Sequence, residues 1–261
     1  MRYAKGSIRL SESQDYPLLR QVLRCGYVTP NQLYDFMNLT HHEWSRPSFH
    51  WRVRRLLDRG LVVQRPAPGG ESVFSIGSNG ALILQGRGEY CLIGPRRLGS
   101  NNGEFSILHA VELNEIHLSL LRSGLPATWT PASEVRSQNE LSDFGYVKDY
   151  DAVVWVKWAD GEIRFALEYE RSAKAAKHYQ AIASLLKRES RVSHVLYLVS
   201  NYDLLSYVKK FFGQAAVGVY FGVVRDWHAH LLEMPVSVAS TPVSWPLCQA
   251  LQPPKSARSS A

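Results

Sequence analysis

Residues 149–179, DYDAVVWVKWADGEIRFALEYERSAKAAKHY, carry the strongest pattern in the C-terminal half of the chain. Two apolar runs of β-forming residues flank Asp160-Gly161, a dipeptide that strongly favours a β-hairpin. With these two residues as the tight loop, antiparallel pairing places Asp151 opposite Glu170. The stretch therefore predicts a long hairpin in which both strands carry acidic residues.

The same pairing assigns side chains to the two faces of the hairpin, because side chains alternate along a strand. The acidic face is predicted to hold Asp151, Glu168 and Glu170. The opposite, apolar face is predicted to hold Tyr150, Ala152, Val154, Val156, Phe165, Leu167 and Tyr169. Three carboxylates on one face repel one another and are costly to bury, and a hard divalent cation would neutralise them.

The composition is that of a folded protein, with 45% apolar and 20% charged residues among 261. The net charge of +7 is compatible with a polyanionic partner such as nucleic acid.

The three cysteines, Cys25, Cys91 and Cys248, are far apart and include no CxxC pair, which argues against a zinc site or disulfide framework. No apolar run is long enough for a membrane span and no signal-peptide pattern is present, so we expect a cytoplasmic protein.

Residues 1–14 are polar and predict a flexible arm, and residues 15–85 have the pattern of a winged helix-turn-helix. Apolar residues at i, i+3 and i+4 predict a first helix from Asp15 that stops at Gly26. Thr29 followed by Pro30 predicts the start of a second helix. A third helix is predicted from Ser45 or Arg46 to Gly60, and a β-hairpin with a Pro/Gly-rich turn follows.

Arginines concentrate on the third helix, which is the recognition helix of a winged helix-turn-helix. Exposed arginines there are suited to contact phosphates and guanine edges in the major groove of DNA. The predicted DNA-binding residues on or next to this helix are Arg46, Arg52, Arg54, Arg55 and Arg59. Arg65, on the predicted wing, is a weaker candidate for contacts with the DNA backbone.

The remaining chain divides into three predicted segments. Residues 86–105 are rich in Gly, Ser and Asn and predict a linker, and residues 236–261 predict a C-terminal tail that ends in disorder. Residues 106–235 predict a domain with the order α-β-β-β-α-β-α-β, a mixed α/β layer architecture. Within this domain, the polar segment 137–147 is expected to be irregular, and a helix is expected from Ser172 to Lys187.

The strand with Asp151, the strand with Glu168-Tyr169-Glu170 and the helix and strands around them resemble the PD-(D/E)XK nuclease superfamily. Glu170 stands where that superfamily usually has lysine, and Lys174 or Lys177 on the following helix is the candidate replacement. With the basic winged helix, the His109 to Asn114 helix and the ALEYERS strand end, the chain resembles the replication-relaxation family of plasmid and mobile-element proteins. This resemblance covers about residues 15–230.

The resemblance implies an α/β chain, α+β overall, with an N-terminal winged helix followed by a restriction-endonuclease-like mixed-sheet domain. It implies that Asp151, Glu168 and the carbonyl oxygen of Tyr169 bind Mg²⁺ or Mn²⁺. Glu170 or Lys174 would then orient the attacking water. The implied catalytic residues are therefore Asp151, Glu168, Glu170 and Lys174.

Several interpretations remain open at this point. The protein is either a Mg²⁺-dependent DNA endonuclease or nickase of a plasmid or mobile element, or a non-catalytic DNA-binding regulator with a degenerate nuclease fold. The second would serve as a replication or mobilisation accessory protein. A separate alternative to a metal site is that Glu168 and Glu170 simply pair with Arg171, Lys174 and Lys177 on a solvated edge. A third, less favoured interpretation uses the winged helix for protein contact.

The partners follow from these interpretations. Both DNA interpretations expect double-stranded DNA as the partner and no membrane. Both also leave room for a homodimer and for replication or mobilisation proteins as further partners.

Overall fold

The computed structural model describes residues 9–89, 102–143, 145–159, 161–213, 217–241 and 243–252 of the 261-residue chain. The chain divides into two compact units, residues 1–114 and 115–261. The boundary falls within the long helix α5 (Asn102–Arg122), which begins four residues before the predicted residue 106. Most of the predicted linker, residues 90–101, lies outside the described residues.

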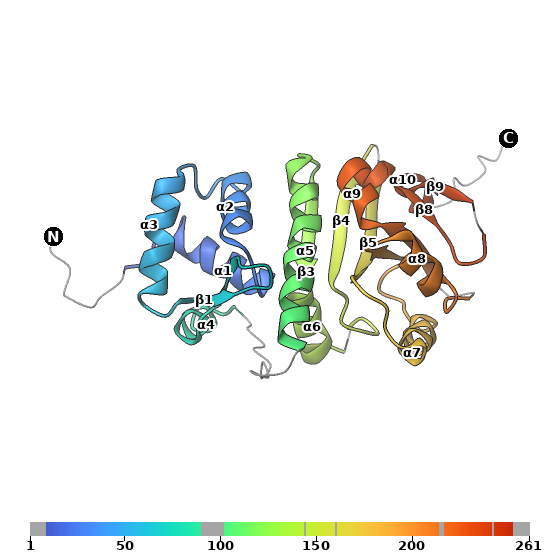
Figure 1. The fold of residues 1–261 in the computed structure, drawn as a ribbon, viewed down its shortest axis with the longest axis horizontal. Coiled ribbons are helices and arrows are strands. Elements are labelled where there is room, and N and C mark those ends of the chain that lie inside the picture. The colour runs from blue at the N-terminus through green and yellow to red at the C-terminus, as the bar shows by residue number, and fades with distance from the viewer. Residues whose placement is uncertain are drawn as a thin grey trace. The chain divides into compact units, whose positions relative to one another are not determined.

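Unit 1 has three helices, a two-stranded hairpin and a fourth helix before it enters α5 (Figure 1). Its elements are α1 (Asp15–Cys25), α2 (Pro30–Leu39), α3 (Arg46–Leu57), β1 (Val62–Pro66), β2 (Ser72–Ile76) and α4 (Ser78–Gln85). The predicted order of three helices followed by a hairpin is confirmed. An isolated antiparallel bridge between Val28 and Phe74 adds a third short segment beside β2.

Local chemistry explains where these helices begin. The Thr29 hydroxyl accepts a hydrogen bond from the backbone N–H of Gln32, and the Gln32 side chain accepts one from the backbone N–H of Thr29. This reciprocal capping box, with Pro30 as the first helical residue, fixes the start of α2. Ser45 caps α3 in a similar way through the backbone N–H of Ser48.

Residues 11–14, predicted to belong to a flexible arm, are bound to unit 1. The backbone N–H of Ser11 donates to the Asp15 carboxylate over 2.7 Å, and Arg52 donates to the Gln14 side chain over 2.6 Å. Glu12 forms an ion pair with Arg87 over 2.7 Å. The prediction of a free arm is therefore wrong for these residues, because the Ser11 carbonyl oxygen accepts from the first N–H groups of α1 and Glu12 pairs with Arg87.

Unit 2 contains a seven-stranded mixed sheet in the order β3-β4-β5-β6-β7-β8-β9. Its strands are β3 (Ala127–Pro131), β4 (Ala152–Trp158), β5 (Gly161–Glu170), β6 (His194–Val199), β7 (Gly218–Val223), β8 (Pro235–Ser237) and β9 (Ser244–Pro246). Its helices are α6 (Ala132–Leu141), α7 (Ala176–Leu186), α8 (Tyr202–Lys209), α9 (Val224–His230), the 3₁₀ turn η1 (Leu231–Glu233) and α10 (Leu247–Ala250).

The strands β3, β4 and β5 form an antiparallel meander, and β5, β6 and β7 run parallel. Parallel neighbours require a crossover, which α7 provides between β5 and β6 and α8 between β6 and β7. Both faces of β5 are buried in its second half, as is usual for a strand with a parallel neighbour inside a sheet.

The hairpin of β4 and β5 forms, but its register differs from the prediction by two residues. Trp158 pairs with Gly161 and Val153 pairs with Ala166, so residues 159 and 160 connect the strands. Ala159 takes the left-handed conformation, with φ of 50°, that a tight two-residue connection demands. Because the shift is even, Glu168 and Glu170 remain on the predicted face of the sheet.

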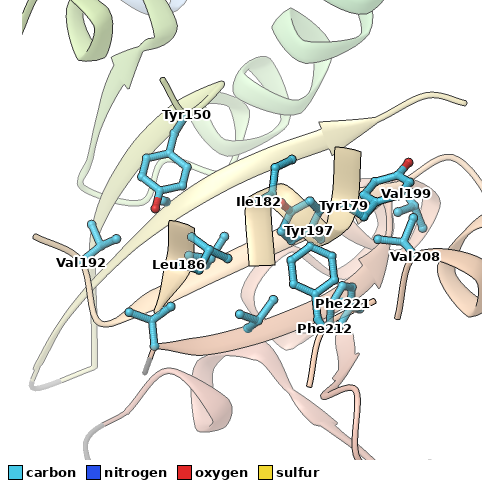
Figure 2. Packing of buried hydrophobic residues seen from close by; sticks show 14 of the residues in the cluster. Tyr150, Tyr179, Ile182, Leu186, Val192, Tyr197, Val199, Val208, Phe212 and Phe221 are labelled. Atoms are coloured by element: carbon cyan, nitrogen blue, oxygen red, sulfur yellow. The ribbon is translucent and has the colours of Figure 1, made fainter. Parts of the chain in front are cut away.

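A hydrophobic cluster lies on the same face as these acids, beneath α7 (Figure 2). Tyr150 belongs to this cluster together with Val153, Ala166 and Tyr197, although alternation had placed it on the opposite face. The reason is that β4 begins only at Ala152, so the period of two does not extend back to Tyr150. Burial is complete for Tyr150, Ala166 and Tyr197.

Two further expectations for unit 2 are wrong. Residues 137–141, expected to be irregular, belong to helix α6, in which Val135 is buried against the sheet. Residues 236–252, expected to be a tail, contain β8, β9 and α10, and Val236, Leu247 and Leu251 are buried. The burial of these apolar side chains holds the segment in place.

No helix within the described parts of the chain is long and apolar enough to cross a membrane.

Candidate functional site

Two glutamates at the end of β5 are among the most buried charged residues of unit 2. Glu168 is 6% exposed and Glu170 is 2% exposed. The parallel pairing of β5 with β6 places Glu168 beside Tyr197 and Glu170 beside Val199, on the face that α7 covers. Buried carboxylates are rare unless another group compensates their charge, so this pair marks a candidate functional site.

Lys148 compensates the charge of Glu168. Its Nζ atom forms a hydrogen-bonded ion pair with Glu168 Oε1 and lies 4.9 Å from the centre of the Tyr150 ring. Burial nevertheless raises the pKa of Glu168 to about 7, the neighbouring charges of Asp151 and Glu170 raise it further, and Lys148 opposes the rise. A carboxyl group with a pKa near neutrality can exchange a proton under physiological conditions.

Lys174 compensates the charge of Glu170 over a distance of 2.8 Å. Lys174 was expected on the following helix, but it precedes α7, where its backbone N–H donates to the Tyr179 hydroxyl over 3.1 Å. Burial opposes its positive charge, yet the hydrogen bond with Glu170 and the nearby acids hold the pKa of Lys174 above its ordinary value. Helix α7 starts later than predicted because residues 171–175 form an irregular segment, from which Lys174 contacts Glu170 and Tyr179.

Asp151 lies at the start of β4, next to the end of β5. Its Oδ2 atom accepts a hydrogen bond of 2.8 Å from the backbone N–H of Tyr169, between the two glutamates. Its carboxylate also raises the pKa of Glu168, which indicates that the two charges are near each other. The structure therefore brings Asp151, Glu168, Glu170 and Lys174 to one end of the β4–β5 pair.

The tyrosines around the acids have different environments. The Tyr150 hydroxyl donates to the buried Glu189 carboxylate over 2.7 Å, and that carboxylate also accepts from the backbone N–H groups of residues 147, 190 and 191. In contrast, the Tyr197 hydroxyl has no hydrogen-bond partner among the described residues. Burial, together with Glu168 and Glu170, raises the pKa of Tyr197 well above its ordinary value.

A divalent cation at this site would need oxygen ligands from the residues around the two glutamates. In the described parts of the chain, no group of three or more His, Cys, Asp or Glu side chains lies close enough to hold a metal ion. A smaller set of hard oxygen donors fits Mg²⁺ or Mn²⁺ by type, namely the carboxylates of Asp151 and Glu168 and the carbonyl oxygen of Tyr169. The buried negative charge also favours a cation at this point.

The arginines of unit 1 occupy three different environments. Arg46 and Arg54 on α3 and Arg59 just after it are exposed. Arg46 lies 4.3 Å from the centre of the Tyr34 ring and donates to Asn31 over 3.2 Å. Half-buried Arg65 on β1 donates to the Ser75 hydroxyl over 3.3 Å. This leaves α3 with an exposed cationic side.

Arg52 was expected to be exposed, and this prediction is wrong. Its side chain is buried and forms ion pairs with Asp15 over 2.9 Å and with Glu43 over 3.2 Å. Arg55, which is 26% exposed, also pairs with Asp15. Burial opposes the Asp15 charge, but the Ser11 N–H and both arginines hold the pKa of Asp15 below its ordinary value. Arg52 thus connects α3 to α1.

Sequence patterns did not identify Lys148 or Tyr197 as site residues. Lys148 lies outside any regular element, so no periodicity points to it, although its position three residues before Asp151 places it near the acids. Tyr197 has the appearance of a core residue within the apolar strand β6. Only the parallel pairing of β6 with β5 brings its hydroxyl to the acidic face.

No protein-family model matches the chain, and neither the curated proteins nor the solved structures gave a match.

Proposed function

We propose that the protein binds DNA through unit 1 and that unit 2 hydrolyses a phosphodiester bond with the help of Mg²⁺ or Mn²⁺. One observation carries the catalytic part of this proposal. Two buried glutamates and Asp151 lie together at the ends of β4 and β5, and each glutamate has its own lysine. Charges are rarely buried at such density without a function, because desolvation is costly.

The order of elements supports the proposal. Apart from the additional helix α6 between β3 and β4, helix α5, the antiparallel strands β3, β4 and β5, helix α7 and the parallel strand β6 come in the order that the resemblance to PD-(D/E)XK nucleases implies. The three helices and hairpin of unit 1 follow the winged helix order that the same resemblance implies. A plasmid or mobile-element protein of the replication-relaxation type remains our proposal for the identity of the chain.

In this proposal, Asp151, Glu168 and the Tyr169 carbonyl hold the cation, which would supply Lewis-acid polarisation of the phosphate when bound. The hydrogen bond from the Tyr169 N–H keeps the Asp151 carboxylate at the end of β5. Glu170 accepts a hydrogen bond from the attacking water. Lys174, 2.8 Å from Glu170, stabilises the negative charge that develops on the phosphate. Lys148 balances Glu168 when no cation is present.

A second candidate function is a non-catalytic DNA-binding protein with the same fold. The observation that favours it is that Lys148 and Lys174 already neutralise both buried glutamates. In this alternative, the ion pairs stabilise unit 2 and no cation binds. DNA binding through the exposed arginines of α3 would be unchanged.

Thermal unfolding in the presence of MnCl₂ separates the two functions. The catalytic proposal expects Mn²⁺ to raise the Tm of the full chain, because an ion that binds only the folded state stabilises it. Asp151→Asn should lose this shift while its amide oxygen still accepts from Tyr169 N–H. Glu162→Gln, which removes an exposed carboxylate at the far end of β5, is the matched control and should keep the shift. Equal shifts in all three proteins, or none in wild type, would favour the non-catalytic candidate.

A further inference from the structure

The solvent-facing side of α3 carries an unusually exposed tryptophan. Trp51 is 62% exposed, whereas tryptophan is normally well buried in folded proteins. Pro47 and Arg54 lie one turn before and after Trp51, His50 directly precedes it in the sequence, and all three are exposed. The helix sequence RPSFHWRVRRLL contains four arginines and no acidic residue. This side of α3 is therefore aromatic and cationic.

The Trp51 ring is held in place from one side. The guanidinium of Arg55 lies 4.9 Å from the centre of the ring. Arg55 is in turn fixed by its ion pair with Asp15, whose side chain is fully buried. The Trp51 side chain nevertheless stays largely exposed to solvent. Trp51 thus offers an exposed aromatic platform with a guanidinium beside it.

Charge and shape together indicate what such a platform would accept. Nucleic-acid bases stack on exposed aromatic rings while nearby cations contact the phosphates, and this combination is typical of proteins that bind single strands. Arg54 on the same side of the helix, with Arg46 and Arg59 at its two ends, would provide the phosphate contacts. In intact duplex DNA the faces of the bases are covered by their neighbours. The ring can therefore stack only on a base that is unpaired or at an open end.

We propose that Trp51 stacks on an unpaired base, so that unit 1 prefers DNA with single-stranded or open segments to continuous duplex. This inference rests on the proposed DNA binding by unit 1 and specifies its substrate class. An apolar protein partner is the competing occupant, but the exposed arginines on and just after α3 outnumber the nearby acid, Asp58 at the C-terminal end of the helix, and favour a polyanion.

The test is a fluorescence anisotropy titration of the full-length protein in EDTA with a labelled 20-nucleotide single strand, the matching duplex, and a duplex with a short unpaired bulge. Wild type should bind the single strand and the bulged duplex more tightly than the continuous duplex. Trp51→Ala should weaken binding of the first two about tenfold or more and change duplex binding little. Trp51→Phe should keep most of the affinity, because phenylalanine also stacks.

Leu82→Ala is the matched control, since Leu82 on α4 is 65% exposed in the same unit. It should leave all three affinities unchanged. The inference is overturned if Trp51→Ala binds every DNA as wild type does, or if it weakens all three DNAs equally. If wild type binds no DNA at all, the proposed DNA binding by unit 1 and the stacking inference both fail. If wild type binds duplex DNA but Trp51→Ala changes no affinity, only the stacking inference fails.

Discussion

Glu168 is central to the chemistry that we propose for unit 2. It is 6% exposed and lies on the sheet face that carries the hydrophobic cluster, with Lys148, Asp151 and Glu170 as its charged neighbours. Lys148 reduces the electrostatic cost of its charge but does not remove it, because burial raises the pKa of Glu168 to about 7. The residue therefore destabilises the folded protein when ionised, which is common for groups that are retained for function.

This raised pKa predicts a specific pH dependence of stability. Between about pH 4.5 and 7, folded Glu168 keeps a proton that the unfolded chain has lost. The free energy of unfolding should therefore fall as pH rises through this interval and level off above it, with a contribution of about 3 kcal/mol from this residue. Glu168→Gln mimics the protonated acid, so its stability should equal that of wild type below the interval and exceed it above.

Urea denaturation at pH 5 and pH 8, followed by circular dichroism, measures this difference. Glu162→Gln serves as the control, because Glu162 is exposed on the same strand and should leave the wild-type dependence unchanged. If Glu168→Gln loses as much stability between the two pH values as wild type does, Glu168 does not have the raised pKa described above.

At the scale of elements, α3 has two sides with different roles. Its inner side carries Phe49, Val53 and Leu56 together with Arg52, which is buried between Asp15 and Glu43. Its outer side carries Trp51 and Arg54. Of two arginines only two positions apart, Arg52 is thus buried in ion pairs, whereas Arg54 is exposed and is a residue that we propose contacts DNA.

Alanine substitutions of these two arginines should separate the roles. Arg52→Ala leaves Asp15 and Glu43 buried without their main partner and should reduce the free energy of unfolding by about 3–5 kcal/mol. Arg54→Ala should change it by less than about 0.5 kcal/mol, as exposed substitutions usually do. Urea denaturation of the two variants checks this, and a loss for Arg52→Ala as small as that expected for Arg54→Ala would show that the buried ion pairs of Arg52 add little to stability.

The sequence predicted the elements of both units well where local chemistry specifies them. Thr29 and Pro30 locate the start of α2, and glycine at position 26 follows the end of α1. The hairpin of β4 and β5 was expected from Asp160-Gly161, but its register was two residues in error. The sequence pattern does not reveal that Ala159, rather than a glycine, adopts the left-handed conformation.

The candidate site was only partly predictable. Asp151, Glu168 and Glu170 follow from the alternation of strand residues, since an even register error preserves the faces. Their lysines do not follow, because Lys148 and Lys174 lie in irregular segments. The burial of Arg52 depends on contacts with Asp15, thirty-seven positions away, and Glu43, nine positions away, which helical periodicity does not encode.

At the scale of the whole molecule, two compact units divide the proposed tasks. Unit 1 carries the exposed arginines and Trp51, and unit 2 carries the buried acids. The net charge of +7 is favourable for a chain that approaches DNA, although the acidic site itself would repel phosphate unless a cation or its lysines compensate. Cleavage of DNA by unit 2 is therefore the central claim of this account.

Incubation of supercoiled plasmid with the full-length protein and Mn²⁺, followed by agarose electrophoresis, tests that claim most directly. Wild type and Glu162→Gln should convert the plasmid to nicked or linear forms, and EDTA should prevent the conversion. Asp151→Asn should be slower by about 100-fold, because it removes a charge from the site that stabilises the transition state. Plasmid that stays supercoiled with wild type in Mn²⁺, or that Asp151→Asn cuts as fast as wild type, would contradict the account.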